Sequence, residues 1–175
     1  VSLALTYVLP EDSNLRIVQC LLGRMKGLGF RPGVLYADKE FCEGPVLRYL
    51  QKAWIPSVLA CPIRGKNGGT RGLCTGRKAY RTTYTFSDST PADVAVVPTL
   101  KRDKKTRKQQ RTWLVYVIIH LDWSAKKIQQ RYRHRFGIES SYRQFGYLRA
   151  RTTSRNPALR FLLMGLGFLL LNIWV

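Results

Sequence analysis

The sequence predicts a mixed α/β fold, in which helices flank a sheet. Short apolar runs rich in β-formers alternate with segments whose apolar residues recur at helical spacing. The order is β-α-β-α-β, then a β-rich stretch, then two helices. The chain has 175 residues, 45% of them hydrophobic, which is enough for one domain with a buried core.

The first half of the chain supplies the alternating pattern. Residues 2–9 are apolar and predict a strand. Helix-start residues at 11–14 precede apolar residues at helical spacing, and Gly27 and Gly29 are suited to end that helix. We then expect a short strand at 34–37, a helix at about 43–53 and a strand at 57–63.

The second half begins with a change of character. Residues 64–76 are glycine-rich and basic, which indicates a loop or hairpin. Strands are expected at 79–86, at 94–97 and, with the strongest signal, at 112–121. Ser124 can cap a long helix that runs to about residue 150, and Asn156-Pro157 opens a last helix.

The charge of the chain indicates an anionic partner. With 30 Lys+Arg against 10 Asp+Glu, the formal charge is +20, which destabilises a compact domain unless an anion binds. Nucleic acid is the expected partner; ribosomal RNA and an anionic membrane are the alternatives. We expect neither a membrane nor a small-molecule substrate. The apolar run 161–175 is shorter than the roughly 20 residues of a membrane span, and predicts a buried core helix.

A basic run at 101–111 carries seven positive charges against one negative. Such a run is either a solvated loop or a loop that contacts phosphates. In a chain this basic we favour the second reading, with Lys104, Lys105 and Arg107 as DNA-binding residues.

The four cysteines form no CxxC pair, and both histidines lie far from them in sequence. This pattern argues against a zinc site and, in a domain of this size, against a disulfide framework. We expect reduced thiols in a cytoplasmic setting.

Two acids are candidates for metal binding. Asp38 directly follows an apolar strand, where side chains of α/β folds meet ligands. Glu139 is a lone carboxylate among arginines, and helical spacing places it on one face with Tyr132, Arg135 and Arg143. The alternatives are an ordinary loop aspartate and an exposed Arg135–Glu139 ion pair worth about 0.3–0.5 kcal/mol.

Other strand-end or helix-start acids, Asp12 and Asp122, are treated as decoys. Separated carboxylates suit an enzyme that cleaves phosphodiesters, because two Mg²⁺ ions about 3.5–4 Å apart need hard oxygen ligands.

The spacing Tyr132-x2-Arg135-x3-Glu139 matches the start of the Y-(2)-R-(3)-E-(6)-K signature of insertion-sequence transposases with a DDE triad. The surrounding residues resemble the group placed with insertion sequence four, including halobacterial and cyanobacterial members. Residues 37–41 resemble that group's second-aspartate motif, and residues 151–157 and 171–174 extend the likeness. The resemblance therefore covers nearly the whole chain.

This resemblance implies a ribonuclease-H-like fold with a β-rich insertion before the helix that carries the catalytic Glu. Residues 1–63 and 112–175 would form the core, and 64–111 the basic insertion. Asp38 and Glu139 would be catalytic acids that hold two Mg²⁺ or Mn²⁺ ions. Tyr132, Arg135 and Arg143 would lie near DNA.

The implied reaction is hydrolysis at the transposon ends, followed by strand transfer into target DNA. The implied assembly is a homo-oligomer on DNA, in the prokaryotic cytoplasm at the nucleoid.

Two departures qualify the resemblance. The signature's final Lys falls on Gly146, and Arg143 or Arg149 is the candidate replacement. The first aspartate of the triad is expected upstream of Val1, so we expect this chain to be a fragment that is inactive alone, with the full-length parent as the enzyme. The alternative function is a basic nucleic-acid-binding module without catalysis.

Overall fold

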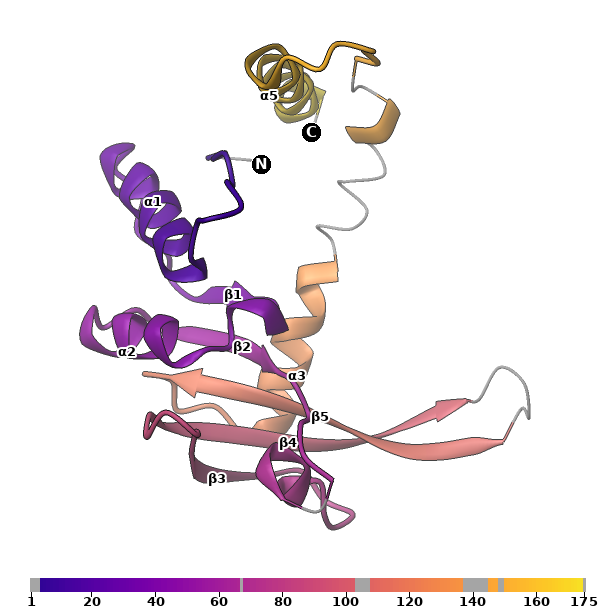
Figure 1. The fold of residues 1–175 in the computed structure, drawn as a ribbon. Helices are drawn as coiled ribbons and strands as arrows, with labels where there is room; N and C mark the ends of the chain where they lie inside the picture. Colours follow the sequence, from indigo (N-terminus) through magenta and orange to yellow (C-terminus); the bar gives the residue numbers. More distant parts are fainter. Residues whose placement is uncertain (1–3, 67, 103–107, 137–144, 148–149, 175) are drawn as a thin grey trace. The chain divides into compact units, whose positions relative to one another are not determined.

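A computed structural model describes residues 4–66, 68–102, 108–136, 145–147 and 150–174 (Figure 1). The chain divides into two compact units. One comprises Val1–Arg31 with His134–Val175, and the other comprises Pro32–Arg133.

The unit Pro32–Arg133 is built on a five-stranded mixed sheet in the order β1-β2-β5-β4-β3. β1 pairs with β2 in parallel, and the other neighbours pair antiparallel. The mixed α/β prediction is therefore confirmed, and the sheet is compatible with a ribonuclease-H-like transposase fold. The strands are β1 (Leu35–Ala37), β2 (Ser57–Cys61), β3 (Tyr80–Thr85), β4 (Pro91–Arg102) and β5 (Gln109–Ile119).

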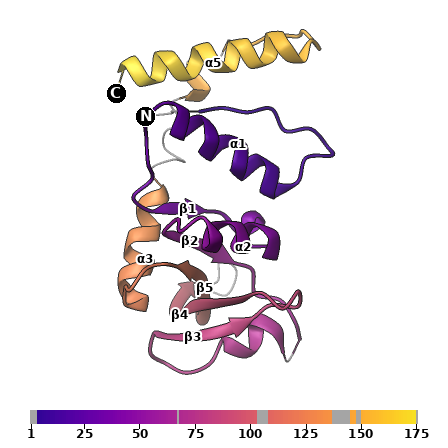
Figure 2. The same cartoon turned by 90° about the vertical axis from the view of Figure 1, so that its left-hand side faces the viewer.

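Helices α2 (Gly44–Lys52) and α3 (Ala125–Arg133) cover opposite faces of this sheet (Figure 2). Successive strand residues point to opposite faces, so both faces need apolar side chains. On the α3 face, Ile128 and Tyr132 pack into a cluster of the buried strand residues Val58, Ala95, Val97, Tyr116 and Ile118. α2 contributes the fully buried Val46, Leu47 and Leu50.

β4 and β5 continue together past their neighbours (Figure 1). β3 pairs with β4 only as far as Val96, and β2 pairs with β5 only as far as Val115, whereas β4 and β5 remain paired to Arg102 and Gln109. β4 is thus longer than the predicted strand at 94–97, because antiparallel pairing draws both ends of the basic run 101–111 into the ladder.

The unit that contains both termini holds α1 (Asn14–Gly27) and α5 (Pro157–Trp174). Ser13 caps α1 by accepting a hydrogen bond from the amide of Arg16 at 3.2 Å. Asn156 caps α5 by accepting from the amide of Ala158 at 2.9 Å. Both capped starts confirm the predictions made from these residues.

The strand predicted at 2–9 is wrong for residues 4–9, which form no strand. Tyr7 instead stacks on Phe161 of α5 with ring centroids 4.0 Å apart, and its hydroxyl donates to the carbonyl of Pro157 at 2.7 Å. The apolar residues of this segment are therefore used in side-chain packing on a helix rather than in a ladder.

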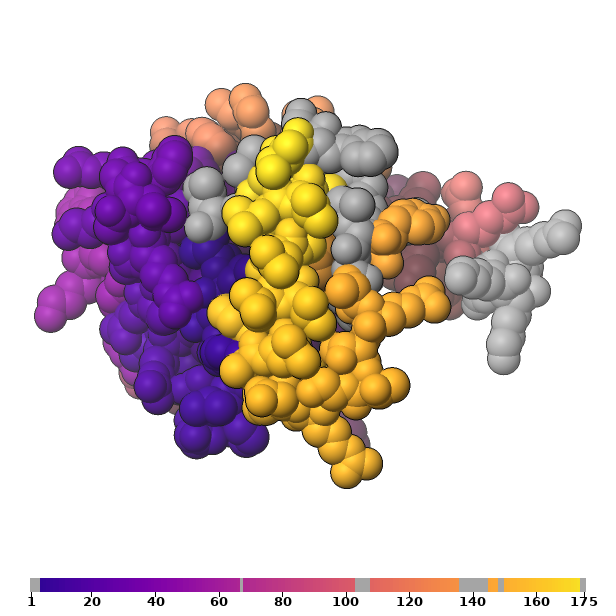
Figure 3. All heavy atoms as spheres, turned by 90° about the horizontal axis from the view of Figure 1, so that it is seen from above, coloured from indigo at the N-terminus to yellow at the C-terminus, as the bar shows by residue number. Residues whose placement is uncertain are grey.

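The expectation of a buried C-terminal helix is also wrong. Leu162, Leu169 and Ile173 are 57%, 58% and 81% exposed, and Figure 3 shows the open outer surface of α5. A small cluster of Phe145, Phe168 and Leu171 covers only part of the helix, whose apolar residues run all the way round. None of the described helices has the length and hydropathy needed to cross a membrane.

The helix predicted from Ser124 to about 150 is shorter in the described range. Ser124 does cap it, accepting from the amide of Lys127 at 3.3 Å. α3 ends at Arg133, and a short 3-10 helix follows over His134–Phe136.

Candidate active site

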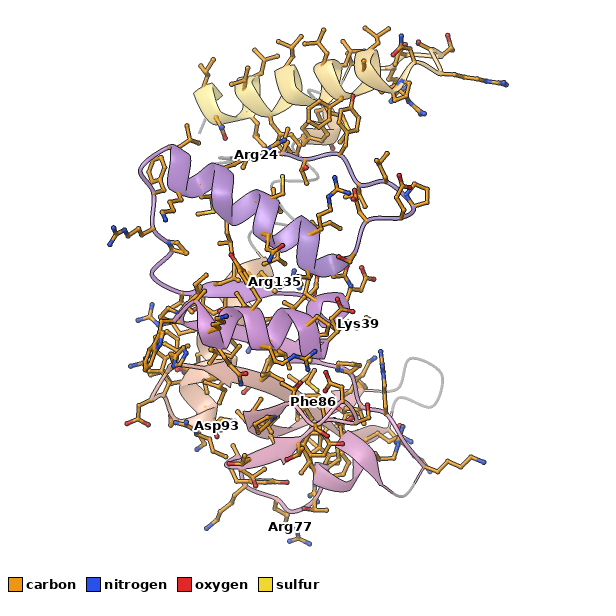
Figure 4. All side chains as sticks on the ribbon, turned by 60° about the vertical axis from the view of Figure 1, so that its left-hand side comes forward. Arg24, Lys39, Arg77, Phe86, Asp93 and Arg135 are labelled. Atoms are coloured by element: carbon orange, nitrogen blue, oxygen red, sulfur yellow. The ribbon has the colours of Figure 1, made fainter. Side chains whose placement is uncertain are left out.

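Asp38 lies at the carboxyl end of β1, as the sequence predicted. The parallel register pairs Ala37 with Leu59, so Asp38 is the first residue past the ladder. A 3-10 helix, Lys39–Phe41, follows, and the amide of Phe41 donates to the carbonyl of Asp38 at 3.1 Å. Asp38 is exposed at this edge. The residue that follows it, Lys39, is labelled in Figure 4. Edges where strands end in α/β sheets are common ligand sites.

Tyr132 joins α3 to this edge. Its hydroxyl donates a hydrogen bond to the carbonyl of Ala37 at 3.0 Å, and its side chain is only 5% exposed. Its ring lies 4.9 Å from that of Tyr116 and 6.2 Å from that of Tyr36. Tyr132 is thus a core residue, and its hydroxyl contacts the backbone of Ala37, the residue before Asp38. This position gives it a structural role at the candidate site, and its contact with DNA stays a prediction.

Burial around Tyr132 also affects its aromatic neighbours. Desolvation, with a smaller contribution from Tyr132, raises the pKa of Tyr116 to about 12. Desolvation likewise raises the pKa of Tyr36, although the nearby Arg131 opposes the shift. The hydroxyls of Tyr116 and Tyr36 therefore stay neutral near pH 7 and act as hydrogen-bonding groups.

Several predicted site residues lie outside the described residues: Glu139, Arg143, Lys104, Lys105 and Arg107. The approach of Asp38 and Glu139 thus stays a prediction. Arg135 is in the 3-10 helix His134–Phe136 and is partly buried.

Four other aspartates form ion pairs with arginines. Asp12 pairs with Arg16 at 2.9 Å, and Asp88 with Arg48 at 2.6 Å. Arg81 pairs with both Asp93 at 3.3 Å and Asp122 at 3.0 Å. Asp12 and Asp122, the two decoys of the sequence analysis, thus have structural partners.

The donor chemistry of Asp38 suits a divalent cation, because carboxylate oxygens are the ligands that Mg²⁺ and Mn²⁺ prefer. A second carboxylate would have to come from elsewhere in the chain. Within the described ranges, no three His, Cys, Asp or Glu side chains gather in a way that would hold a metal ion.

A pair of thiols lies beneath the Asp38 edge. Cys42 follows the 3-10 helix after Asp38, Cys61 ends β2, and both are buried. A side-chain hydrogen bond between Cys42 and Cys61 lowers the pKa of Cys42 and raises that of Cys61. Sequence reasoning treated these cysteines only as free thiols and did not detect this pairing, because they come from separate elements.

A groove lined by Arg77, Lys78, Lys126 and Arg133 was also missed. The signal was present in part: Lys126, Gln130 and Arg133 follow the i, i+4, i+7 spacing of one helix face.

A family model described as the transposase DDE domain matches residues 13–173. A comparison with curated proteins finds no match. The family generally uses divalent metal ions, and its activity is DNA cleavage and transposition. Because the match extends over far more than half of the sequence, this chain belongs to the family of transposases with a DDE domain.

Proposed function

We propose that this chain forms part of the catalytic domain of a DNA transposase of the insertion-sequence-four-like group. Asp38 and Glu139 are its second and third catalytic carboxylates, and together they hold two Mg²⁺ or Mn²⁺ ions. The observation that carries the proposal is the Tyr132–Ala37 hydrogen bond. It connects the helix that begins the Tyr-Arg-Glu signature to the strand that directly precedes Asp38.

The chemistry divides between the ions and the side chains. When bound, two divalent cations activate the attacking hydroxyl and stabilise the leaving oxygen of a phosphodiester. Asp38 and Glu139 would hold these two cations beside the reacting phosphate, while arginines and lysines bind the flanking phosphates. The products are freed transposon ends, whose 3′-hydroxyls attack target DNA.

We further propose that residues 64–111 are an insertion into the ribonuclease-H-like core. β3 and β4 come from this segment and extend the sheet on the far side of β5 from β2. The proposed core, 1–63 and 112–175, supplies β1, β2 and most of β5. We infer a homo-oligomer on DNA, because two transposon ends must be joined to one target.

The test uses the protein from its complete gene and a plasmid that carries the DNA flanking that gene. Asp38→Asn and Glu139→Gln are each expected to abolish divalent-ion-dependent cleavage while duplex binding is retained, because removing an acid from a basic surface does not weaken phosphate contacts. The matched control is Asp122→Asn, another exposed strand-end aspartate, which should still cleave.

The same experiment separates the second candidate function. A non-catalytic basic module, which explains the charge of +20 equally well, binds duplex DNA and cleaves none in any variant or in the wild type. Cleavage that survives in Asp38→Asn contradicts the catalytic assignment.

A further inference from the structure

A groove of about 670 Å³ on the α3 side of the sheet has cations on both walls. Arg77, labelled in Figure 4, and Lys78 come from the loop that precedes β3. Lys126 and Arg133 come from α3, and Val97 with Pro98 of β4 form part of the lining between them. No acidic residue is among the described residues that line this groove.

The three sides of α3 have different surroundings. Ala125, Ile128 and Tyr132 face the sheet and are buried. Lys127 and Arg131 lie over the ring of Trp123, at 5.1 Å and 6.0 Å from its centroid. The remaining side, with Lys126, Gln129, Gln130 and Arg133, forms a wall of the groove.

Lysines and arginines along one helix often only face solvent. Here, cations also line the opposite wall of the groove. Arg77 and Lys78 bring charge of the same sign to the same groove, where it repels that of α3. None of the ion pairs found among the described residues involves these four cations. An anion in the groove would relieve the repulsion.

The spacing of the cations favours a polyanion over a single phosphate ion. Lys126 and Arg133 are seven residues apart on α3, or about 10 Å at 1.5 Å per residue. The phosphates of one DNA strand follow each other at about 3.4 Å along the duplex axis. Neighbouring phosphates of one strand therefore fit the length of the groove better than one isolated anion does.

We propose that this groove binds the phosphodiester backbone of DNA and leads it to the Asp38 edge. Arg133 follows Tyr132, whose hydroxyl is bonded to Ala37, so this end of the groove adjoins the candidate site. Gln129 and Gln130 add amide donors for phosphate oxygens. The inference rests on the proposed function in one respect, namely that the polyanion is DNA. It does not depend on catalysis.

The test measures binding of the chain to a fluorescein-labelled duplex of random sequence by anisotropy, between about 50 and 200 mM salt. One variant, Lys126→Gln with Arg133→Gln, changes the helix wall. A second, Arg77→Gln with Lys78→Gln, changes the loop wall and leaves α3 intact. The control, Arg31→Gln with Lys52→Gln, removes the same charge from exposed positions outside the groove.

Each groove variant is expected to bind more weakly than the control. The slope of log Kd against log salt should fall by about two, or about one for each lost phosphate contact. Circular dichroism and the thermal midpoint verify that each variant is folded. A folded variant of either wall that keeps the salt slope of the control overturns the inference.

The outcome separates this inference from the proposed function. Groove variants that bind like the control, together with an Asp38→Asn protein that no longer cleaves, overturn the groove and leave the catalytic assignment in place. Groove variants with reduced slopes, together with an Asp38→Asn protein that still cleaves, support the groove and overturn the catalytic assignment.

Discussion

The hydroxyl of Tyr132 donates a hydrogen bond to the backbone carbonyl of Ala37 at 3.0 Å, across 95 residues of sequence. One partner opens the Tyr-Arg-Glu signature, and the other is the residue before Asp38. A single contact therefore joins two of the sequence motifs that carry the family resemblance. It also explains why a tyrosine is useful there: the ring is buried against Tyr116, and its hydroxyl reaches the strand end.

Tyr132→Phe tests this contact, because it keeps the ring and leaves the Ala37 carbonyl without this donor. The free energy of unfolding is expected to fall by about 0.5–1.5 kcal/mol, measured by urea denaturation. The matched control is Tyr147→Phe, which removes a hydroxyl from a side chain that is 90% exposed and should change stability by less than about 0.5 kcal/mol. Equal effects of the two substitutions would contradict the role given to Tyr132.

Ile128 anchors the middle of α3 and is fully buried on the sheet. Ile128→Ala leaves a cavity and is expected to reduce the free energy of unfolding by about 2–5 kcal/mol, whereas Ile128→Val should cost about 0.5–1.5 kcal/mol. Urea titration of both variants gives the comparison. If the two losses are alike and small, α3 is not packed on the sheet as described.

Local signals in the sequence were sufficient to predict several elements. Ser13 and Asn156 identify helix starts because a capping side chain acts on amides two or three residues away. The strand over 112–121 could be predicted for a similar reason, since a continuous run of apolar and β-branched residues is a property of one segment.

Properties that depend on distant partners could not be predicted. Residues 4–9 have a strand-like composition, but Tyr7 packs on Phe161, far away in sequence. The length of β4 is set by its pairing with β5, down to Arg102 opposite Gln109. The apolar composition of α5 likewise does not determine whether the helix is buried, because burial requires a partner surface.

The candidate site shows the same division. The position of Asp38 at a strand end follows from the apolar run before it, and could be predicted. The burial of Tyr132 could not, because an aromatic residue in a basic helix suits DNA contact and core packing equally well. The opposite walls of the groove, from Arg77 and from α3, meet only through the antiparallel sheet between them.

Gly44 allows close approach of Asp88 to the first turn of α2. A Cβ at Gly44 would lie 1.4 Å from Oδ2 of Asp88, so Gly44→Ala must displace this carboxylate from Arg48. We expect a lower thermal midpoint. Gly23→Ala is the matched control, because Gly23 is exposed on α1 with open space around it; this change should stabilise the protein by up to about 1 kcal/mol. Stabilisation by both substitutions would show that Asp88 does not occupy this position.

Asp88 should also give the folded protein a dependence on acid pH. The Arg48 guanidinium, with further hydrogen bonds from Thr90, holds the pKa of the Asp88 carboxyl below its ordinary value of 3.8. Folding therefore favours the ionised form, so its stabilising effect is complete above pH 3.8 and is lost as the pH falls through the lower folded-state pKa.

The measurement is the thermal midpoint of wild type and Asp88→Asn from neutral pH down to about pH 2. The variant should be the less stable protein above pH 3.8, and the difference should shrink below that pH, because the wild-type carboxylate is then protonated as well. Arg48→Gln removes the first cause of the shift and should show the same convergence with the wild type. The difference in thermal midpoint between wild type and variant could instead stay constant from neutral pH down to the acid end of the titration. That result would mean that the Asp88–Arg48 pair does not favour the ionised carboxylate, despite the short distance between the two side chains.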